Sequence, residues 1–452
     1  MKTRILSIVL FITTCYTAYP AGEKIKLIDL IDAALGNRGN ITALRTDLEI
    51  AGLQTSGLFS EYLPQISAVY DFRYNIKSPT QIIPLGQFNP VPTDEKRAII
   101  FGTAWQQNAG VSLYQPLFDF SIRSRVAESR INEKLKNADV AAAERDLKSE
   151  VIRSFILISI REEQLRSAIA DTLRTGKTLD LIMDRADEGK VLKTDLNMAL
   201  LNHNNALANF RSSLSVLMQE KMYMGFLTGY PLEFLMDGEY DFASSMIRID
   251  FQAGLVPVTD SIPEIERLKI RAELAEKQQK TEISRKIPVL GVDGFLGASQ
   301  YTDTFDPVKE GTWYGSSYVG VSLRLPILSG DNTRSRISQL RLEARGIQER
   351  IEDEKARIVN NGLRLSEEIS QLEYLLAVSE QNASLLEENI TIYQNLFTKG
   401  QVTAYDLINR EVDLQKEHAR INEQRARILD KKLEMITNSG YLQSFLNDLR
   451  SE

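Results

Sequence analysis

Residues 331–398 read DNTRSRISQLRLEARGIQERIEDEKARIVNNGLRLSEEISQLEYLLAVSEQNASLLEENITIYQNLFT. Apolar residues recur mostly three or four positions apart, and Glu, Arg, Gln, Lys and Asp fill the positions between them. This spacing predicts one amphipathic helix with a narrow apolar stripe, roughly 100 Å long at about 1.5 Å per residue. Lys399 and Gly400 interrupt the pattern, and a second amphipathic helix follows from Thr403. The stretch therefore predicts a very long helical hairpin.

The placement of proline predicts a second helical region of the same kind. The chain has 13 prolines, but none lies between Leu117 and Tyr230 and none follows Pro326. Proline breaks helices, so two long blocks without it indicate two long helical regions. We expect the first to run from Ser121 to about Glu188, to turn, and to return to about Met222.

Short motifs recur in register between the two halves of the chain. The segment Gly-Val-Ser-Leu occurs at 110–113 and again at 320–323, each followed by a proline three positions later. Four residues near the expected hairpin turns also recur 211 positions later: Gly189, Val191, Asp195 and Leu196 correspond to Gly400, Val402, Asp406 and Leu407. Matches at several points in one order indicate a tandem duplication.

Four stretches alternate between apolar and polar residues, as strands do. They are residues 66–75, 108–116, 289–301 and 314–325. In the first, one face carries only apolar residues and ends in aromatics: Ile66, Ala68, Tyr70, Phe72 and Tyr74. About ten residues with this alternation are typical of a strand in a transmembrane β-barrel. Residues 77–103 between the first two strands are expected to form a proline-rich loop.

The domain organisation follows from these elements. We expect a signal peptide at residues 1–21, a first repeat at 22–222 (helix, two strands, hairpin), a connector at 223–261, a second repeat at 262–441 and a tail at 442–452. The connector is non-periodic and contains several glycines and prolines.

The N-terminus has the features of an export signal. Lys2 and Arg4 precede a short apolar run, and small residues follow near Ala18 and Ala21, where cleavage is expected. Cys15 is the only cysteine, so a cleaved chain has neither a thiol nor a disulfide. Residues 12–15 loosely resemble a lipobox, which leaves lipidation of Cys15 as an alternative.

Composition and motifs argue against several classes of function. The net charge of −7 and the lack of a basic face disfavour a nucleic-acid partner. The chain contains no glycine-rich phosphate loop, Cys-x-x-Cys, His-Glu-x-x-His or Gly-x-Ser-x-Gly motif, and we expect neither an enzyme nor a cofactor. His203 and His418 have no partner at metal-ligand spacing, so no metal site is expected.

Four strands are too few to close a transmembrane barrel, which needs about eight. Open strand edges in lipid leave backbone groups unsatisfied. The strands therefore predict that copies of the chain share one barrel, with eight strands from two copies or twelve from three.

The chain resembles the TolC family of outer-membrane efflux and secretion channels. The motifs that carry the resemblance are the strand entry Leu-Pro-x-Ile at 63–66, the strand exits at Gly110 and Gly320, and the hairpin turns Gly-x-Val-x-x-x-Asp-Leu at Gly189 and Gly400. The resemblance covers essentially the whole mature chain. It implies a mixed α/β, mainly helical membrane protein: a homotrimer whose duplicated hairpins form an α-barrel and whose chains each add four strands to a twelve-stranded β-barrel.

The resemblance also implies a function. It implies the exit duct of a tripartite efflux pump, located in the bacterial outer membrane with its helical tunnel in the periplasm. The duct passes small molecules passively from a periplasmic adaptor protein and an inner-membrane transporter, and it contacts outer-membrane lipid. Two alternatives remain: the duct of a type I protein secretion system, or a periplasmic coiled-coil adaptor or scaffold.

The resemblance places a constriction at the hairpin turns. Asp195 and Asp406 lie six residues after Gly189 and Gly400, and in a trimer they would supply six carboxylates around one pore, which favours cations. Phe397, Val402 and Asn409 would neighbour this constriction, and Asn409 replaces a residue that is acidic in some relatives. The alternative for the two aspartates is a helix cap or first-turn role.

Overall fold

The computed structural model describes residues 24–78, 80–84, 96–100, 102–242, 262–308, 313–327 and 330–450. The expected signal peptide, Cys15 and residues 243–261 of the expected connector lie outside these residues. The chain divides into two compact units. The first takes its described residues from Met1–Thr42, Ala143–Ile262 and Arg357–Glu452, and the second comprises Ala43–Ala142 and Pro263–Ala356.

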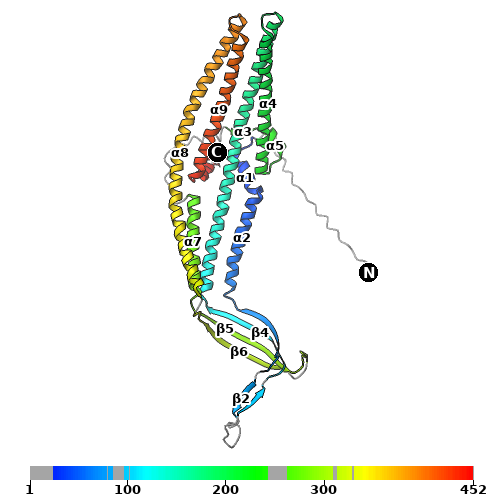
Figure 1. Cartoon of the computed structure of the whole chain (residues 1–452), viewed down its shortest axis with the longest axis vertical. Coiled ribbons are helices and arrows are strands. Elements are labelled where there is room, and N and C mark those ends of the chain that lie inside the picture. Colours follow the sequence, from blue (N-terminus) through cyan, green and yellow to red (C-terminus); the bar gives the residue numbers. More distant parts are fainter. Residues whose placement is uncertain are drawn as a thin grey trace, which may run out of the picture. The chain divides into compact units, whose positions relative to one another are not determined.

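Two long helical hairpins dominate the structure (Figure 1). The first consists of α3 (Phe120–Asp187) and α4 (Lys193–Thr228), and the second of α8 (Gly330–Thr398) and α9 (Ala404–Asn438). Both hairpins agree with the periodicity and the proline-free blocks. The helix α4 runs six residues past the expected end at Met222 and stops at Gly229, whose φ of 77° ends the helix.

The single helix expected before the two strands of the first repeat is two helices, so that prediction was wrong in this detail. The helix α1 (Leu27–Asn37) ends at Arg38, which is extended, and α2 (Gly39–Ser60) begins directly after it. The helix α7 (Pro263–Ser284) holds the corresponding place in the second half. Glycine is a poor helix residue, and Gly36 and Gly39 flank the break.

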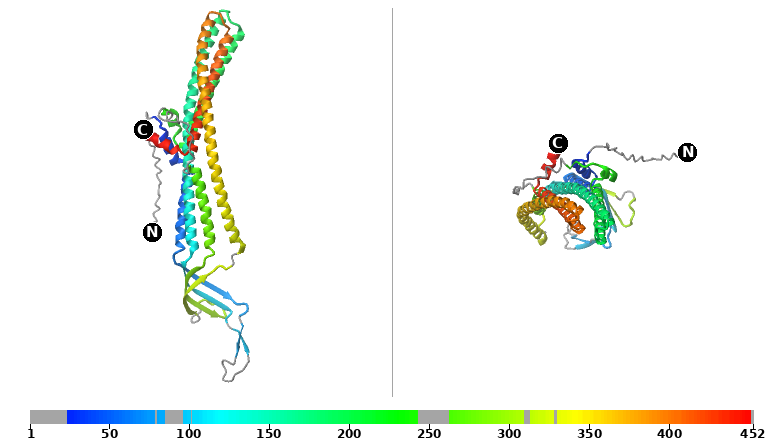
Figure 2. Two further views of the ribbon diagram at one scale, coloured as in Figure 1. Left: turned by 90° about the vertical axis from the view of Figure 1, so that its left-hand side faces the viewer. Right: turned by 90° about the horizontal axis from the view of Figure 1, so that it is seen from above.

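A second set of short elements builds a core beside the hairpins in the first unit (Figure 2). It contains α1, α5 (Leu232–Asp237) and α10 (Leu442–Arg450), which pack on the middle of α3 and the ends of α4 and α9. Its fully buried side chains include Leu30, Phe155, Met224 and Leu235. Burial of such side chains contributes about 1.5–3 kcal/mol each.

The second unit contains a four-stranded antiparallel sheet. Its strands are β1 (Gln65–Tyr74), β4 (Trp105–Phe118), β5 (Val289–Thr302) and β6 (Trp313–Arg324), in the order β1-β4-β5-β6. The four predicted strands are confirmed. The expected loop at 77–103 also holds an antiparallel hairpin of β2 (Thr80–Pro84) and β3 (Lys96–Ile100).

The register gives the sheet one apolar and one polar face. Ile66, Leu113, Gly294 and Val319 lie in one row across the four strands, and the next row on that face is Ala68, Val111, Leu296 and Ser317. The opposite face carries hydrogen-bonded polar side chains: Ser67 with Ser112 (2.7 Å) and Ser299 with Asn108 (2.8 Å). The apolar face is uncovered in a single chain, with Ile66, Leu296, Val319 and Val321 at least 70% exposed.

Glycines on the polar face allow aromatic rings to lie flat on the sheet. Gly110 and Gly297 face each other on β4 and β5, and the ring of Phe295 lies over both. A Cβ at Gly297 would come within 2.3 Å of the Ala109 carbonyl oxygen and 2.7 Å of Phe295 Cζ. Rings placed over strand glycines fill the missing side-chain volume and fix the register of curved sheets.

Among the described residues, the helices contain no segment with the length and apolarity of a membrane span.

We predict that Gly297→Ala destabilises the sheet by about 1–3 kcal/mol, because the added methyl group overlaps backbone atoms that cannot move independently. Gly346→Ala on α8 is the matched control, since nothing lies within 4 Å of its Cβ position. It should stabilise by about 0.5–1 kcal/mol through helix propensity. Thermal denaturation of both variants measures the difference. Equal effects of the two changes would contradict the proposed close packing at Gly297.

Candidate functional site: the hairpin turns

The two hairpin turns are built in the same way. In the first, Gly189 has φ 71°, its N–H donates to Ala186 O (2.9 Å), and the Lys190 N–H donates to Arg185 O (2.9 Å). In the second, Gly400 has φ 73°, and the corresponding bonds run to Phe397 O (3.0 Å) and from Gln401 to Leu396 O (2.9 Å). Both are Schellman motifs, which end a helix at a left-handed glycine. Nothing lies within 4 Å of a Cβ at either glycine, so positive φ is the reason for glycine there.

One apolar cluster joins the two turns, which Figure 1 shows side by side. Phe397 (3% exposed) and Leu407 (0%) are buried in it, and Val191 and Val402 from the two turns pack against it. The sequence places Phe397 and Val402 beside the turn, and the structure brings both into this cluster. The hairpins are therefore held together near their ends by apolar contact.

Arg185, near the end of α3, adds a polar link to the second hairpin. Its guanidinium lies 4.9 Å from the centre of the Phe397 ring, and Nη2 donates to the carbonyl of Thr398 at the end of α8. A cation at a helix C-terminus is favoured by the helix dipole, and its position over the ring adds a cation–π contact. Arg185 thus connects the ends of α3 and α8.

The two aspartates of the expected ring differ in their surroundings. Asp406 belongs to a capping box: its N–H donates to Thr403 Oγ1 (3.2 Å), and its Oδ2 accepts from the Thr403 N–H (3.1 Å) and Oγ1 (2.6 Å). Asp195 occupies the same place on α4, but the N-cap there is Leu192, which has no side-chain acceptor. Among the described residues the Asp195 carboxylate has no hydrogen-bond or ion-pair partner.

Hydrogen bonds change the acidity of Asp406. The side chain of Thr403 and then its backbone N–H lower the pKa of this carboxyl below its ordinary value of 3.8. Glu188, beside the first turn, also has a lowered pKa, because Lys190 donates a hydrogen bond to it. Both groups remain ionised around neutral pH.

Asn409 lies half-buried one turn after Asp406 and brings no charge. The next acidic residue of α9, Glu411, is fully buried and points into the bundle. Whether the two aspartates form one ring depends on the assembly of several chains, so the ring remains a prediction.

Three residues of this region were missed from the sequence. Thr403 stands three positions before Asp406, which is the spacing of a capping box, and this signal was present. Glu411 lies four residues after Leu407 and three before Leu414, on the apolar stripe of its helix, and this signal was overlooked because the residue is charged. Arg185 had no comparable signal.

We predict opposite effects of two changes at the helix starts. Thr403→Ala removes the cap of α9 and should speed amide exchange in its first turn roughly five-fold. Leu192→Thr gives α4 the residue that would complete a capping box with Asp195, and it should slow exchange there. Hydrogen–deuterium exchange measures both turns in one experiment.

The cap of α9 also has a pH dependence. Folding lowers the pKa of Asp406. The stability that the ionised Asp406 carboxylate gives to the first turn of α9 is therefore fully present above pH 3.8, and it is lost as the pH falls through the lowered pKa. Thr403→Ala should abolish this acid-induced loss. A wild-type first turn whose protection is constant across this range would contradict the assignment.

Comparison with known proteins identifies the fold. No family model and no curated protein matches the chain. Solved structures do match: the outer membrane protein VceC of Vibrio cholerae (14% identity, 92% of this chain and 96% of that one, TM-score 0.71) and the CmeC outer membrane channel of Campylobacter jejuni (14%, 92% and 85%, TM-score 0.70). The open state of the Neisseria gonorrhoeae MtrE outer membrane channel matches with 14% identity over 92% of this chain and 88% of that one, at a TM-score of 0.63. The fold expected from the resemblance to the TolC family is confirmed: the chain has the fold of these outer membrane channel proteins.

Proposed function

We propose that the chain is the outer-membrane exit duct of a tripartite efflux pump, which passes small molecules without an energy source of its own. The observation that carries the proposal is the sheet of the second unit. Its apolar face is exposed, and β1 and β6 each have one neighbouring strand among the described residues. A sheet with these properties is suited to lipid only when its edges are closed.

Copies of the chain can close these edges. Four strands per chain and the resemblance to the TolC family support three copies around one twelve-stranded barrel. In this arrangement the face with Ile66 and Val319 contacts lipid, and the face with Ser67, Asn108 and Ser299 lines the pore. Aromatic side chains gather at the strand ends away from the helices, as at a membrane interface. The ring centres of Tyr74 and Trp105 lie 4.8 Å apart there.

The helical hairpins would extend into the periplasm and meet the partners. We infer a periplasmic adaptor protein and an inner-membrane transporter, because a passive duct needs a driven pump upstream. A coiled-coil scaffold accounts for the hairpins but not for a sheet with an uncovered apolar face. Export of proteins by a type I system uses the same kind of duct, and the transporter decides between the two cargoes.

The first test is purification in detergent, followed by mass determination and planar-bilayer conductance on the same sample. We expect a trimer that gives small, mostly closed, cation-selective currents. Val319→Arg places a charge on the apolar face and should abolish insertion, because a charge facing lipid costs about 2–4 kcal/mol per chain.

Ser316→Arg is the control, since it introduces the same charge on the opposite face of the same strand. It should insert and shift ion selectivity toward anions. A soluble species without conductance, or equal loss in the two variants, would refute the membrane channel.

We predict that replacing both Asp195 and Asp406 by Asn weakens cation selectivity and block by divalent cations. Asparagine retains an acceptor for the Thr403 N–H, so the cap of α9 should largely survive, whereas Asp406→Ala removes charge and cap together. The single change Asp195→Asn should have the larger effect, because the Asp406 carboxylate is engaged by Thr403. Unchanged selectivity in a folded double variant would contradict the carboxylate ring.

A further inference from the structure

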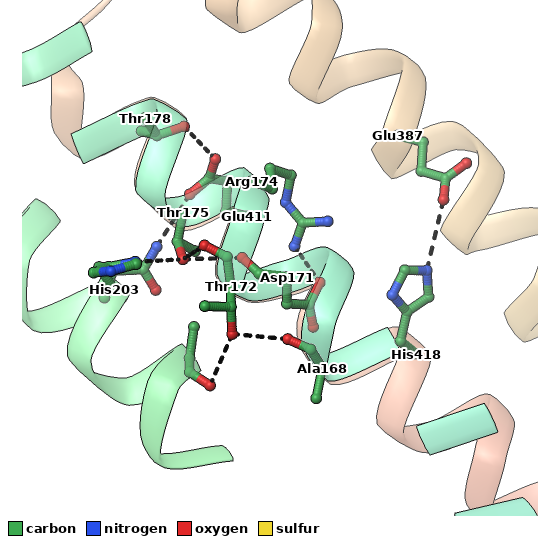
Figure 3. Close-up of polar contacts among 12 residues, drawn as sticks. Ala168, Asp171, Thr172, Arg174, Thr175, Thr178, His203, Glu387, Glu411 and His418 are labelled. Atoms are coloured by element: carbon green, nitrogen blue, oxygen red, sulfur yellow. Dashed lines mark hydrogen bonds and ion pairs between the residues drawn. The ribbon is translucent and has the colours of Figure 1, made fainter. Parts of the chain in front are cut away.

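A buried carboxylate connects the two hairpins away from their turns. Glu411 lies near the start of α9 and is 0% exposed. Thr178 of α3 donates to its Oε1 (2.6 Å), and Asn202 of α4 donates to its Oε2 (3.1 Å). Both donors are buried as well, at 3% and 6% exposure. One side chain of the second hairpin thus bonds to both helices of the first (Figure 3).

The charges around Glu411 do not balance. On α3, Arg174 Nη2 donates to Asp171 Oδ1 at 2.6 Å, and Asp171 is only 4% exposed. The guanidinium is therefore committed to a second buried carboxylate, and its Nε has no hydrogen-bond partner among the described residues. Two carboxylates share one cation, which leaves one negative charge uncompensated if both are ionised.

The other titratable groups nearby have partners of their own. On α4, His203 Nδ1 lies 3.2 Å from Thr175 Oγ1 of α3. On α9, Arg410 pairs with Asp413 (3.4 Å). On α8, Glu387 lies 3.6 Å from the ring of His418, two turns farther along α9 (Figure 3).

The pKa of Glu411 agrees with this geometry. Burial raises the pKa of Glu411 above its ordinary value of 4.5, and the negative charge of Asp171 raises it further. The hydrogen bond from Thr178 and the positive charge of Arg174 oppose this rise. The docked form then binds a proton more tightly than a form in which Glu411 meets water. By linkage, the contribution of Glu411 to the stability of the docked form is fully present below pH 4.5. It is lost as the pH rises through the raised pKa of Glu411.

We propose that Glu411 is a proton-operated clamp: its neutral carboxyl docks α9 against α3 and α4, and loss of the proton releases this contact between the hairpins. The neutral acid still accepts from both Thr178 and Asn202, so protonation removes the uncompensated charge without removing a bond. A consequence for conduction, with acid favouring a closed duct, rests on the proposed function. The docking equilibrium itself does not.

The docking equilibrium can be measured with spin labels at two exposed positions, Asp180→Cys on α3 and Ala419→Cys on α9, in a Cys15→Ser background. Labelled chains are diluted with unlabelled ones, so that only distances within a chain are recorded. Pulsed electron–electron distances are collected between pH 4.5 and neutrality. We expect one short distance at low pH and a second, longer population that grows by up to about tenfold per pH unit, the limit for one proton.

Three variants assign the effect. Glu411→Gln keeps the shape without the charge and should remain docked at every pH. Asp171→Asn releases Arg174 to compensate an ionised Glu411, and it should extend docking toward neutral pH. Glu423→Gln, a 61% exposed carboxylate of the same helix that pairs with Arg427, is the matched control and should behave as the wild type.

Two results would overturn the clamp: a wild-type distance that does not change with pH, or a pH response that persists in Glu411→Gln. A response that disappears in His203→Gln instead would assign it to the imidazole and likewise refute the role of Glu411. Planar-bilayer currents on the same samples separate the two proposals. A pH-dependent distance without conductance supports the clamp and refutes the channel. Conductance with a distance that does not change with pH supports the channel and refutes the clamp.

Discussion

The backbone edges of β1 and β6 constrain the whole chain. In the described part of the chain, each pairs with one strand only, and the face between them exposes large aliphatic side chains. In water such a sheet would aggregate through its edges, and in lipid its unpaired N–H and C=O groups would cost several kcal/mol each. In the proposed assembly the edge of one copy meets the edge of the next, so that these backbone groups are paired.

The register within the sheet depends on small residues. Gly110 and Gly297 meet directly, and Phe295 fills the space above them. A slip by one residue would move Ile66 and Val319 to the polar face and bring Ser67 to the apolar one. The glycine pair and its ring therefore fix the register that the division into two faces requires. Gly-Val-Ser-Leu recurs in β6, but there the carboxylate of Asp293, and not a ring, lies nearest the Cβ position of Gly320.

Periodicity predicted most of the fold, because long helices and alternating strands depend on patterns that local sequence displays. The hairpin turns were predictable from Gly189 and Gly400 for the same reason. The β2–β3 hairpin was missed because the prolines of that segment favour a loop. The burial of Glu411 was missed because its charge favours the exposed face of a helix. Its position does lie on the apolar stripe, four residues after Leu407 and three before Leu414, which α9 buries together.

The duplication makes the divergence of the two hairpins informative. Thr403 and Glu411 of α9 correspond, 211 positions earlier, to Leu192 and Leu200 of α4. The leucines are 70% and 47% exposed, whereas Glu411 is fully buried. Burial and polarity are thus inverted between Leu200 and Glu411, whereas Leu192 and Thr403 are both exposed. Folding of a single chain favours neither choice, since a buried leucine and an exposed glutamate would be more stable. The exposed leucines are consistent with a surface that another chain covers in the proposed assembly, and the buried acid with a contact that must be able to open.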